Sequence, residues 1–236
     1  MRLAARGDAA VLSYAGRVAM PKAQPLPVRV GGFGGVEGLA TYLRTQRVTH
    51  VVDATHPFAA RMSGNAVAAC AAAGVPLAAL TRPPWQAEAG DRWTHVADVA
   101  AAVAALAGPA RRVMLALGRM HVDAFLGQPQ HHYLLRFVDT PAAAPALPHH
   151  DLVVDRGPFT IEGDRRLMAA HRTDLVVCKN AGGSGAQAKL IAARALGLPV
   201  MLIDRPALPT RTAYDRIDDV LNWLDHTTSR GADRGV

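Results

Sequence analysis

The stretch that decides the fold occurs twice, as VEGLATYLRTQRVTHVVDATHPF at residues 36–58 and as IEGDRRLMAAHRTDLVVCKNAGG at residues 161–183. The Glu-Gly pairs and the Val-Val pairs of the two copies are each 125 positions apart. Residues 74–77 (GVPL) and 197–200 (GLPV) continue the correspondence at a separation of 123 positions. An internal duplication constrains topology more strongly than the propensity of any single segment. We therefore expect two halves that share one plan.

In both halves, segments with the pattern of strands alternate with segments that have the pattern of helices. Expected strands cover 9–13, 28–30, 50–52, 77–80, 112–117, 133–138, 152–154, 175–178 and 200–203, and expected helices cover 36–45, 57–73, 97–106, 161–171, 186–196 and 214–227. This alternation predicts parallel sheets covered by helices, and the uninterrupted apolar runs are typical of strands buried on both faces. The fold class expected from the sequence is α/β.

The two halves differ at their beginnings. The second half opens with the expected strand at 112–117, whereas the first opens with a helix-like segment at 2–6 that leads directly into the strand at 9–13. In a doubly wound sheet, the turn after the opening strand normally holds the pyrophosphate of a dinucleotide. We therefore expect the first half to lack its opening strand, through a start codon placed too late or a damaged chain, and to bind such a cofactor weakly or not at all.

The composition describes a chain that can bury a core. Of its 236 residues, 50% are hydrophobic and 19% are charged, and the net charge of +7 suits an anionic partner. The longest apolar stretch, 66–80, is interrupted by Gly74 and Pro76 and falls short of the ~18 residues of a membrane span. Without a signal-peptide pattern or a nucleic-acid recognition motif, we expect a cytoplasmic protein with neither a membrane nor a nucleic-acid partner.

Cysteine and histidine spacing does not predict a metal site. Cys70 and Cys178 form no paired motif, so neither a disulfide framework nor a zinc cluster is indicated. The histidine pairs at 131–132 and 149–150 lie in polar surroundings near prolines, where exposed loop imidazoles are the commoner explanation. We expect no metal.

Glycines gather between the strand at 28–30 and the helix that follows it. Gly31, Gly32, Gly34 and Gly35 occupy four of five positions, which is more than a tight turn needs. Their backbone N–H groups could line an anion or a ribose without obstruction by side chains. A ligand role is favoured over a plain turn.

Titratable side chains follow the strand at 50–52. Thr55 and Pro57 suit the cap and first turn of a helix, which structure alone explains. Asp53 and His56 are harder to explain by structure, because the carboxyl ends of parallel strands face the ligand crevice, where such groups bind ligands or transfer protons.

Cations stand at the ends of other expected strands. Lys179 precedes Asn180 and a glycine-rich segment, a point where an ammonium and backbone donors would favour a negatively charged group. Arg17 follows the strand at 9–13, where NADP-type enzymes place a cation for the 2′-phosphate; the alternative is an exposed arginine. Arg156 offers a cation for a carboxylate, and Arg82 could bind either a local carboxylate or substrate.

Together these motifs resemble the precorrin-6A reductase family of the cobalamin pathway. The resemblance spans nearly the whole chain in family order and rests on 13–17, 31–35, 53–58, 82–85, 156–159, 179–183, 188–190 and 205–206. It implies two Rossmann-like lobes with parallel sheets: a nucleotide-binding lobe at 1–109, lacking its opening strand, and a substrate-contacting lobe at 110–236. It also implies that NADPH reduces a ring double bond of the tetrapyrrole precorrin-6A to give precorrin-6B.

The resemblance assigns roles to particular residues. The implied cofactor contacts are Ser13, Arg17, Gly31, Gly32, Gly34 and Thr55, and the implied substrate contacts are Arg156, Lys179, Asn180, Gly182 and Gly183. Asp53, His56, Asp139, Lys179 or solvent could deliver the proton, and the sequence does not choose among them. Two alternatives stay open: an NADH-dependent reductase of cobalt-precorrin-6A, and a Rossmann-like binding module without turnover.

Overall fold

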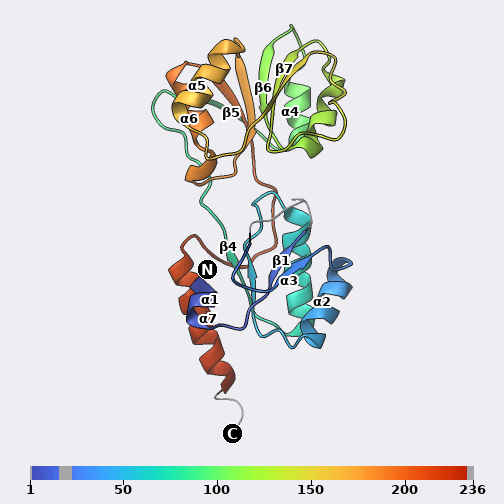
Figure 1. Ribbon diagram of the computed structural model, residues 1–236, viewed down its shortest axis with the longest axis vertical. Coiled ribbons are helices and arrows are strands. Elements are labelled where there is room, and N and C mark those ends of the chain that lie inside the picture. The colour runs from blue at the N-terminus through green and yellow to red at the C-terminus, as the bar shows by residue number, and fades with distance from the viewer. Residues whose placement is uncertain (1, 16–22, 233–236) are drawn as a thin grey trace. The chain divides into compact units, whose positions relative to one another are not determined.

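The chain forms two compact units. A computed structural model describes residues 2–15 and 23–232, with side chains described up to 227. Unit 1 comprises Met1–Ala54, Arg61–Leu80 and Pro209–Val236, and unit 2 comprises Thr55–Ala60 and Thr81–Leu208. Each unit combines parallel strands with covering helices (Figure 1), so the expected α/β class is confirmed.

Unit 2 contains a six-stranded parallel sheet in the order β5-β10-β9-β6-β7-β8. Its strands are β5 (Arg92–Val96), β6 (Arg112–Ala116), β7 (His132–Phe137), β8 (His150–Val154), β9 (Leu175–Lys179) and β10 (Pro199–Ile203). The chain winds from β6 to β7 and β8 on one side, then returns to build β9 and β10 on the other. The winding therefore reverses between β6 and β9, and ligands of open α/β sheets bind at the carboxyl ends of the strands at this reversal.

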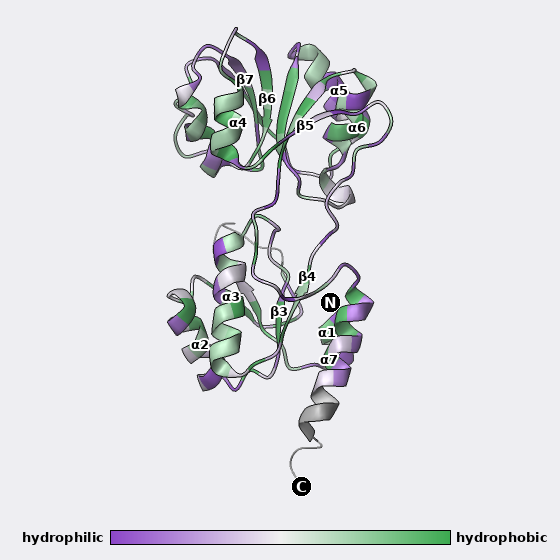
Figure 2. Cartoon of the chain, turned by 180° about the vertical axis from the view of Figure 1, so that it is seen from behind, coloured by the Kyte–Doolittle hydropathy of each residue, from purple (hydrophilic) through white to green (hydrophobic). Residues whose placement is uncertain are grey.

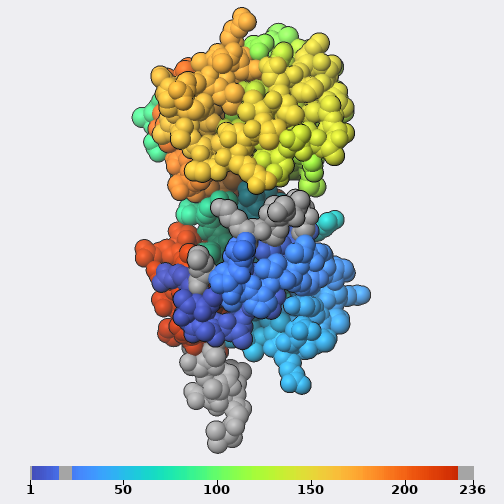
Figure 3. Space-filling view, viewed as in Figure 1, coloured from blue at the N-terminus to red at the C-terminus, as the bar shows by residue number. Residues whose placement is uncertain are grey.

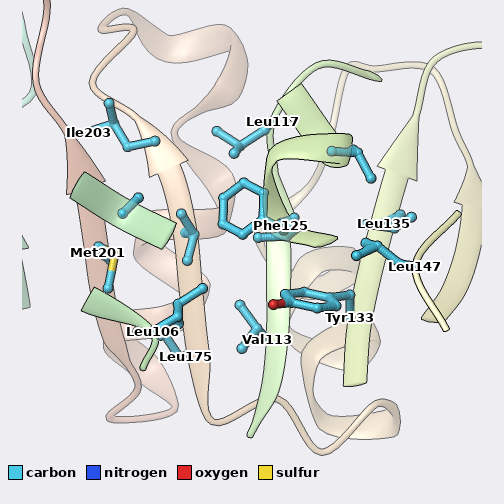
Figure 4. Packing of buried hydrophobic residues seen from close by; sticks show 14 of the residues in the cluster. Leu106, Val113, Leu117, Phe125, Tyr133, Leu135, Leu147, Leu175, Met201 and Ile203 are labelled. Atoms are coloured by element: carbon cyan, nitrogen blue, oxygen red, sulfur yellow. The ribbon is translucent and has the colours of Figure 1, made fainter. Parts of the chain in front are cut away.

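Alternate residues of these strands enter two separate cores. Val113 and Leu115 of β6 face α4 (Val99–Ala105) and the 3-10 helix η1 (Arg119–Gly127), where Phe125 packs near Tyr133 (Figure 4). Met114 faces the opposite side, toward α5 (Ile161–Ala170) and α6 (Ala188–Ala195). Burial on both faces explains the continuous apolar runs, which appear as hydrophobic strands in Figure 2.

Unit 1 has two smaller parallel sheets. β1 (Leu12–Tyr14) pairs with β2 (Val28–Val30), while β11 (Thr212–Tyr214), β4 (Leu77–Leu80) and β3 (Val51–Asp53) form a three-stranded sheet in that order. The helices are α1 (Arg2–Arg6), α2 (Gly35–Thr45), α3 (Ala60–Ala73) and α7 (Ile217–Ala232). The core between α2 and α3 is made largely of small and aliphatic side chains, namely Leu39, Ala40, Leu43, Ala66, Ala69 and Cys70.

The two halves exchange edge strands. β5 follows β4 along the chain but pairs with β10 in unit 2, and β11 follows β10 but pairs with β4 in unit 1. The C-terminal residues therefore pack against the N-terminal ones (Figure 3), with ion pairs from Arg2 to Asp218 at 2.7 Å and from Arg6 to Asp225 at 2.5 Å. The division of the chain into units 1 and 2 therefore differs from the single domain boundary expected between residues 109 and 110. The local sequence does not indicate which sheet a short edge strand joins.

The duplication accounts for the arrangement of unit 1. The strands of unit 1 can be matched to those of unit 2 by their order in the sheets. β3 then corresponds to β9, β4 to β10, β2 to β8 and β1 to β7, and β11 occupies the position that β5 has in unit 2. β6 lies between β9 and β7 in unit 2, so the equivalent position in unit 1 lies between β3 and β1. In the described part of unit 1 no strand occupies it, and β1 and β2 form a sheet of their own.

Some elements have the bounds expected from the sequence and others do not. β2 and β4 begin and end where the sequence predicts. β5 and β11 were not expected, because Arg92–Val96 and Thr212–Tyr214 mix polar and apolar residues as edge strands do. α3 begins at Ala60 rather than at 57, so the capping role expected for Thr55 is wrong. Among the described helices, none combines the length and the apolar character that a bilayer crossing requires.

Candidate active site

The carboxyl end of β9 meets that of β6 at the reversal point of the unit 2 sheet. Lys179 is the last residue of β9, and His121 lies in η1, directly after β6. The Lys179 Nζ is 2.7 Å from the His121 Nε2. Lys179 was expected at a ligand site from its sequence context, whereas His121 was not.

A short segment between β3 and α3 belongs to unit 2 and completes this cluster. In Thr55–Ala60, the Phe58 ring packs against the core of unit 2 and lies 4.9 Å from the Lys179 Nζ, a cation–π distance. The His56 ring centroid is 5.8 Å from that of Phe58, and the His56 Nδ1 accepts a hydrogen bond from the Phe58 N–H at 3.2 Å. The structure therefore brings together two predicted residues, His56 and Lys179, through a phenylalanine that the sequence did not single out.

The charges that act on His56 are all positive. Burial, followed by the charges of Arg82, Lys179 and Arg205, lowers the pKa of His56 from 6.5 to about 4. Burial and the neighbouring charge of Arg82 also lower the pKa of Arg205. Cations crowded in this way repel one another until an anion enters, so this part of unit 2 is suited to bind carboxylates.

The loop after Lys179 is fixed by hydrogen bonds within the protein. The buried Asn180 accepts from the Trp85 N–H at 2.8 Å and donates to the Trp85 carbonyl at 3.3 Å. The Trp85 Nε1 donates to the Gly183 carbonyl at 2.9 Å. The Arg205 guanidinium donates to the carbonyls of Asn180 and Ala181 at 2.9 and 3.1 Å. The segments 82–85, 179–183 and 205–206 are thus one interlocked structure.

Gly182 and Gly183 have a packing reason to be glycine. Their φ angles are 68° and 75°, in the left-handed region. A Cβ on Gly182 would collide with the Pro83 carbonyl oxygen, and one on Gly183 with the Arg82 side chain. Both glycines, and with them Asn180, were expected to contact substrate. Their visible role is to hold the loop against residues 82–85.

Arg156 lies at the same edge of the sheet but not in this cluster. Arg156 follows β8, which lies three strands from β9 in the sheet. Because neighbouring strands are ~4.8 Å apart, β8 and β9 are separated by about 14 Å. The exposed Arg156 guanidinium pairs with the Asp139 carboxylate and donates to the Val138 carbonyl at 3.2 Å. Asp139, one of the possible proton donors, is thereby occupied by an arginine.

The glycine turn of unit 1 is organised by Arg29. The Arg29 guanidinium donates to the Gly31 and Gly32 carbonyls at 2.6 and 2.7 Å and to the Ser13 hydroxyl at 3.4 Å, and it lies 3.8 Å over the Phe33 ring. These contacts cap two carbonyl oxygens that would repel a phosphate. Ser13 of β1 and the turn after β2 therefore lie together.

The outer side of this turn is open. Among the described residues, a Cβ placed on Gly31, Gly32, Gly34 or Gly35 would meet nothing within 4 Å, and no side chain caps the N-terminus of α2. The Gly31 N–H donates to the Tyr14 carbonyl at 2.8 Å, so the backbone donors that fit the ribose or phosphate of a nucleotide are those that follow Gly31. Glu37 in the first turn of α2 adds a negative charge. Arg17, the expected partner of a 2′-phosphate, lies outside the described residues.

Asp53 is tied into a buried ion pair of unit 1. Its side chain is 3% exposed, and its Oδ2 accepts from the Arg211 guanidinium at 2.5 Å and from the Ser63 hydroxyl at 2.7 Å. Arg211 immediately precedes the exchanged strand β11. Of the four residues expected to be able to deliver a proton, Asp53 is thus the one held in a buried ion pair of unit 1.

A further group of titratable residues lies at the opposite edge of the unit 2 sheet. His132, Asp151 and His171 offer ligand atoms within 4.8 Å of one another. The Arg112 guanidinium lies 3.8 Å from the Asp151 carboxylate and 3.2 Å from the His171 Nδ1. Because this positive charge stands where a metal ion would, we interpret the group as an ion-pair network between α5 and the strands.

Sequence reasoning missed His121, Phe58 and Arg29. His121 had a usable signal, since it follows the strand at which the second copy begins and such positions lie at the reversal of a doubly wound sheet. Phe58 had none, because only folding brings it near Lys179. The contacts of Arg29 are local, to carbonyls two and three positions further along the chain, but no sequence pattern pointed to them.

The fold and this edge of the sheet define a class of protein. The strand order of unit 2, with its reversal between β6 and β9 and a cationic cluster at that point, is that of Rossmann-like α/β proteins that bind an anionic ligand at the switch point.

Comparison with known proteins defines the family. The sequence profile of the family described as precorrin-6x reductase CbiJ/CobK matches residues 1–225, and the chain belongs to this family. It is 59% identical to the precorrin-6A reductase of Rhodobacter capsulatus, covering 97% of this chain and 92% of the relative. It is 29% identical to the cobalt-precorrin-6A reductase of Priestia megaterium, covering 81% of this chain and 79% of the relative.

A solved structure has the same fold over nearly the whole chain. The structure titled CobK precorrin-6A reductase matches with a TM-score of 0.89 and 58% identity, covering 96% of this chain and 92% of that chain. The resemblance expected from the motifs is therefore confirmed. A reductase family of this kind implies a nicotinamide cofactor.

Proposed function

We propose that this protein reduces a ring double bond of precorrin-6A with NADPH, giving precorrin-6B in cobalamin biosynthesis. The observation that carries the proposal is the cationic cluster of Arg82, Lys179 and Arg205 in unit 2, whose positive charges act on the His56 imidazole and whose Lys179 Nζ lies 4.9 Å from the Phe58 ring. A macrocycle that bears several carboxylates can form charge-assisted hydrogen bonds with cations of this kind. Membership of the precorrin-6x reductase family supports the same substrate.

The protein's role in this reaction is to bind the macrocycle, to orient it toward the nicotinamide and to supply a proton. When bound, the reduced nicotinamide supplies the hydride, so no side-chain nucleophile is needed. Lys179 and His56 anchor the carboxylates, and the Lys179 ammonium, held between the His121 imidazole and the Phe58 ring, carries the proton that completes the reduction. Arg156, three strands away, contacts a peripheral carboxylate after leaving Asp139.

We assign the nucleotide to unit 1. Ser13, Gly31, Gly32 and Gly34 line its ribose and phosphate groups, and Arg29 makes the turn electrostatically acceptable to them by capping its carbonyls. Arg17 remains the proposed partner of a 2′-phosphate, which would favour NADPH over NADH. Asn180, Gly182 and Gly183 support the substrate cluster by fixing the backbone on which Lys179 stands.

The decisive experiment follows NADPH absorbance with purified protein under anaerobic conditions. We expect NADPH oxidation that depends on precorrin-6A, with a higher kcat/KM for NADPH than for NADH. Lys179→Met should lower kcat/KM by at least roughly tenfold. The matched control is Arg165→Gln, because Arg165 is an exposed cation of α5 that pairs, within the part of the chain that the structure describes, with Glu162 of the same helix.

Three results would contradict the proposal. Binding of NADPH and precorrin-6A without oxidation would indicate a non-catalytic module. A higher kcat/KM for cobalt-precorrin-6A with NADH would indicate the alternative reductase. Equal activity of Lys179→Met and Arg165→Gln would remove the unit 2 cluster from the reaction.

A further inference from the structure

We propose that His121 is a positioning residue that holds Lys179 at the switch point of unit 2 and releases it when the imidazole is protonated. The proposal deepens the function proposed above and rests on it for its kinetic consequences. It starts from the 2.7 Å separation between the Lys179 Nζ and the His121 Nε2.

Two basic groups at this distance can share only one proton. A lysine ammonium has three N–H donors and no acceptor, so His121 must present a lone pair at Nε2. The imidazole is then neutral and carries its proton on Nδ1. Lys179 donates, and His121 accepts.

The surroundings of the pair favour this assignment. The Phe58 ring lies 4.9 Å from the Nζ and stabilises the ammonium form of Lys179. Arg82 and Arg205, whose charges also act on the neighbouring His56, add positive charge from other segments of unit 2, which disfavours a second charge on His121. On its own element His121 has one charge of each sign nearby, Arg119 and Asp123.

The contact fixes a side chain that is otherwise hard to fix. Lysine has a flexible four-carbon stem, and an ammonium that must donate a proton to a bound macrocycle needs a defined place. A neutral imidazole fixes the Nζ without neutralising it, whereas a carboxylate would cancel the charge that attracts the substrate.

Protonation of His121 reverses the interaction. An imidazolium has no acceptor at Nε2 and repels the ammonium, so Lys179 leaves its position and the reaction slows on the acid side. In this step His121 gains one proton from solvent, and no bond to substrate is made or broken.

The experiment compares His121→Gln, His121→Leu and the control His149→Gln, which alters an exposed histidine of the same unit. A glutamine amide oxygen can accept from Lys179 but does not titrate. We expect His121→Leu to lower kcat at least roughly tenfold with an unchanged KM for NADPH. His121→Gln should keep kcat within about threefold at neutral pH and lose the acid limb of the pH profile. Equal impairment of His121→Gln and His121→Leu would overturn the proposal.

A second measurement needs no turnover. In 15N-labelled ligand-free protein, the His121 imidazole should titrate with its proton on Nδ1, and Lys179→Met should raise the midpoint by roughly one pH unit or more, because a like charge is removed. An unchanged midpoint would overturn the pairing. If the midpoint moves while wild-type protein reduces nothing, the proposed function fails and the pairing stands.

Discussion

At the scale of single residues, the unit 2 cluster directs the positive charges of Arg82, Lys179 and Arg205 at the His56 imidazole. The imidazole is held neutral by burial and by three cations that come from different segments of the chain. Asp53, three positions earlier, experiences the opposite environment, with an arginine and a hydroxyl on one carboxylate oxygen. Two titratable residues in one short motif therefore lie in different environments, one among cations and one in a buried ion pair.

We expect His56 to make the protein less stable in acid. Its pKa is about 4 in the folded protein and 6.5 in the reference state, so the unfolded chain binds the proton more tightly. Stability is therefore lost as pH falls below about 6.5, and the loss is complete near the folded value. Unfolding temperatures measured across this range should fall less steeply for His56→Gln. A bound polycarboxylate should also flatten the profile, and an unchanged slope in both cases would contradict the assignment.

Arg29 should control nucleotide binding. Arg29→Met uncaps the Gly31 and Gly32 carbonyls, so we expect the Kd for NADPH to rise by about tenfold, the equivalent of one charge-assisted hydrogen bond. Arg44→Met is the matched control, since Arg44 also caps a carbonyl, that of Ala72, at a distance from the turn. Fluorescence titration with NADPH measures both. Equal effects would show that Arg29 acts only through stability.

At the scale of elements, loops at the carboxyl ends of strands are held by contacts that look like ligand contacts in the sequence. The segment 179–183 is clamped by Trp85 and Arg205, and beneath it the buried Lys189 of α6 donates to the Ala186 carbonyl at 2.5 Å and lies 4.9 Å from the Trp85 ring. The rigidity of this loop is what positions Lys179.

Gly182→Ala should damage this clamp. The added Cβ meets the Pro83 backbone and the φ of 68° disfavours any L side chain, so we expect a loss of about 1–3 kcal/mol and weaker macrocycle binding. Gly185→Ala is the control, because a Cβ there meets nothing within 4 Å. Urea denaturation of both variants decides, and equal stability would contradict the packing role.

The Asp53–Arg211 pair should matter for folding rather than for turnover. Asp53→Asn leaves the nearly buried Arg211 without its counterion, so we expect a loss of about 3–5 kcal/mol in the free energy of unfolding. The double variant Asp53→Leu, Arg211→Met should recover part of it, since no unpaired charge remains. A stable Asp53→Asn protein with a large fall in kcat would instead support the proton-transfer role first expected for Asp53.

At the scale of the whole molecule, the chain passes between its two units more than once. Residues 55–60 leave unit 1 to join unit 2, and the exchanged strands β5 and β11 bind each half of the sequence into the other unit's sheet. Neither unit is therefore built from one continuous half of the sequence. The chain as a whole has a net charge of +7, and the distance over which this charge attracts anions is the screening length, which depends on salt concentration.

Salt should weaken substrate binding more than it weakens the fold. Raising ionic strength from about 0.05 M to about 0.5 M shortens the screening length several-fold, so we expect the KM for the macrocycle to rise while the unfolding temperature changes little. Steady-state kinetics and thermal unfolding in the same buffers measure the two quantities. A KM that does not respond to salt would show that the carboxylates are not bound through exposed cations.

The sequence by itself determined the α/β class, most of the strands and the duplication, because apolar runs, glycine turns and repeated spacing are local properties of the chain. It also placed Lys179 and His56 at strand ends, which parallel topology brings to one edge. Only the tertiary structure decided that β5 and β11 change sheets, that Asp53 pairs with Arg211, and that Gly182 serves packing. Each of these depends on a partner distant in sequence, such as Arg211, 158 positions from Asp53, and local spacing carries no record of such partners.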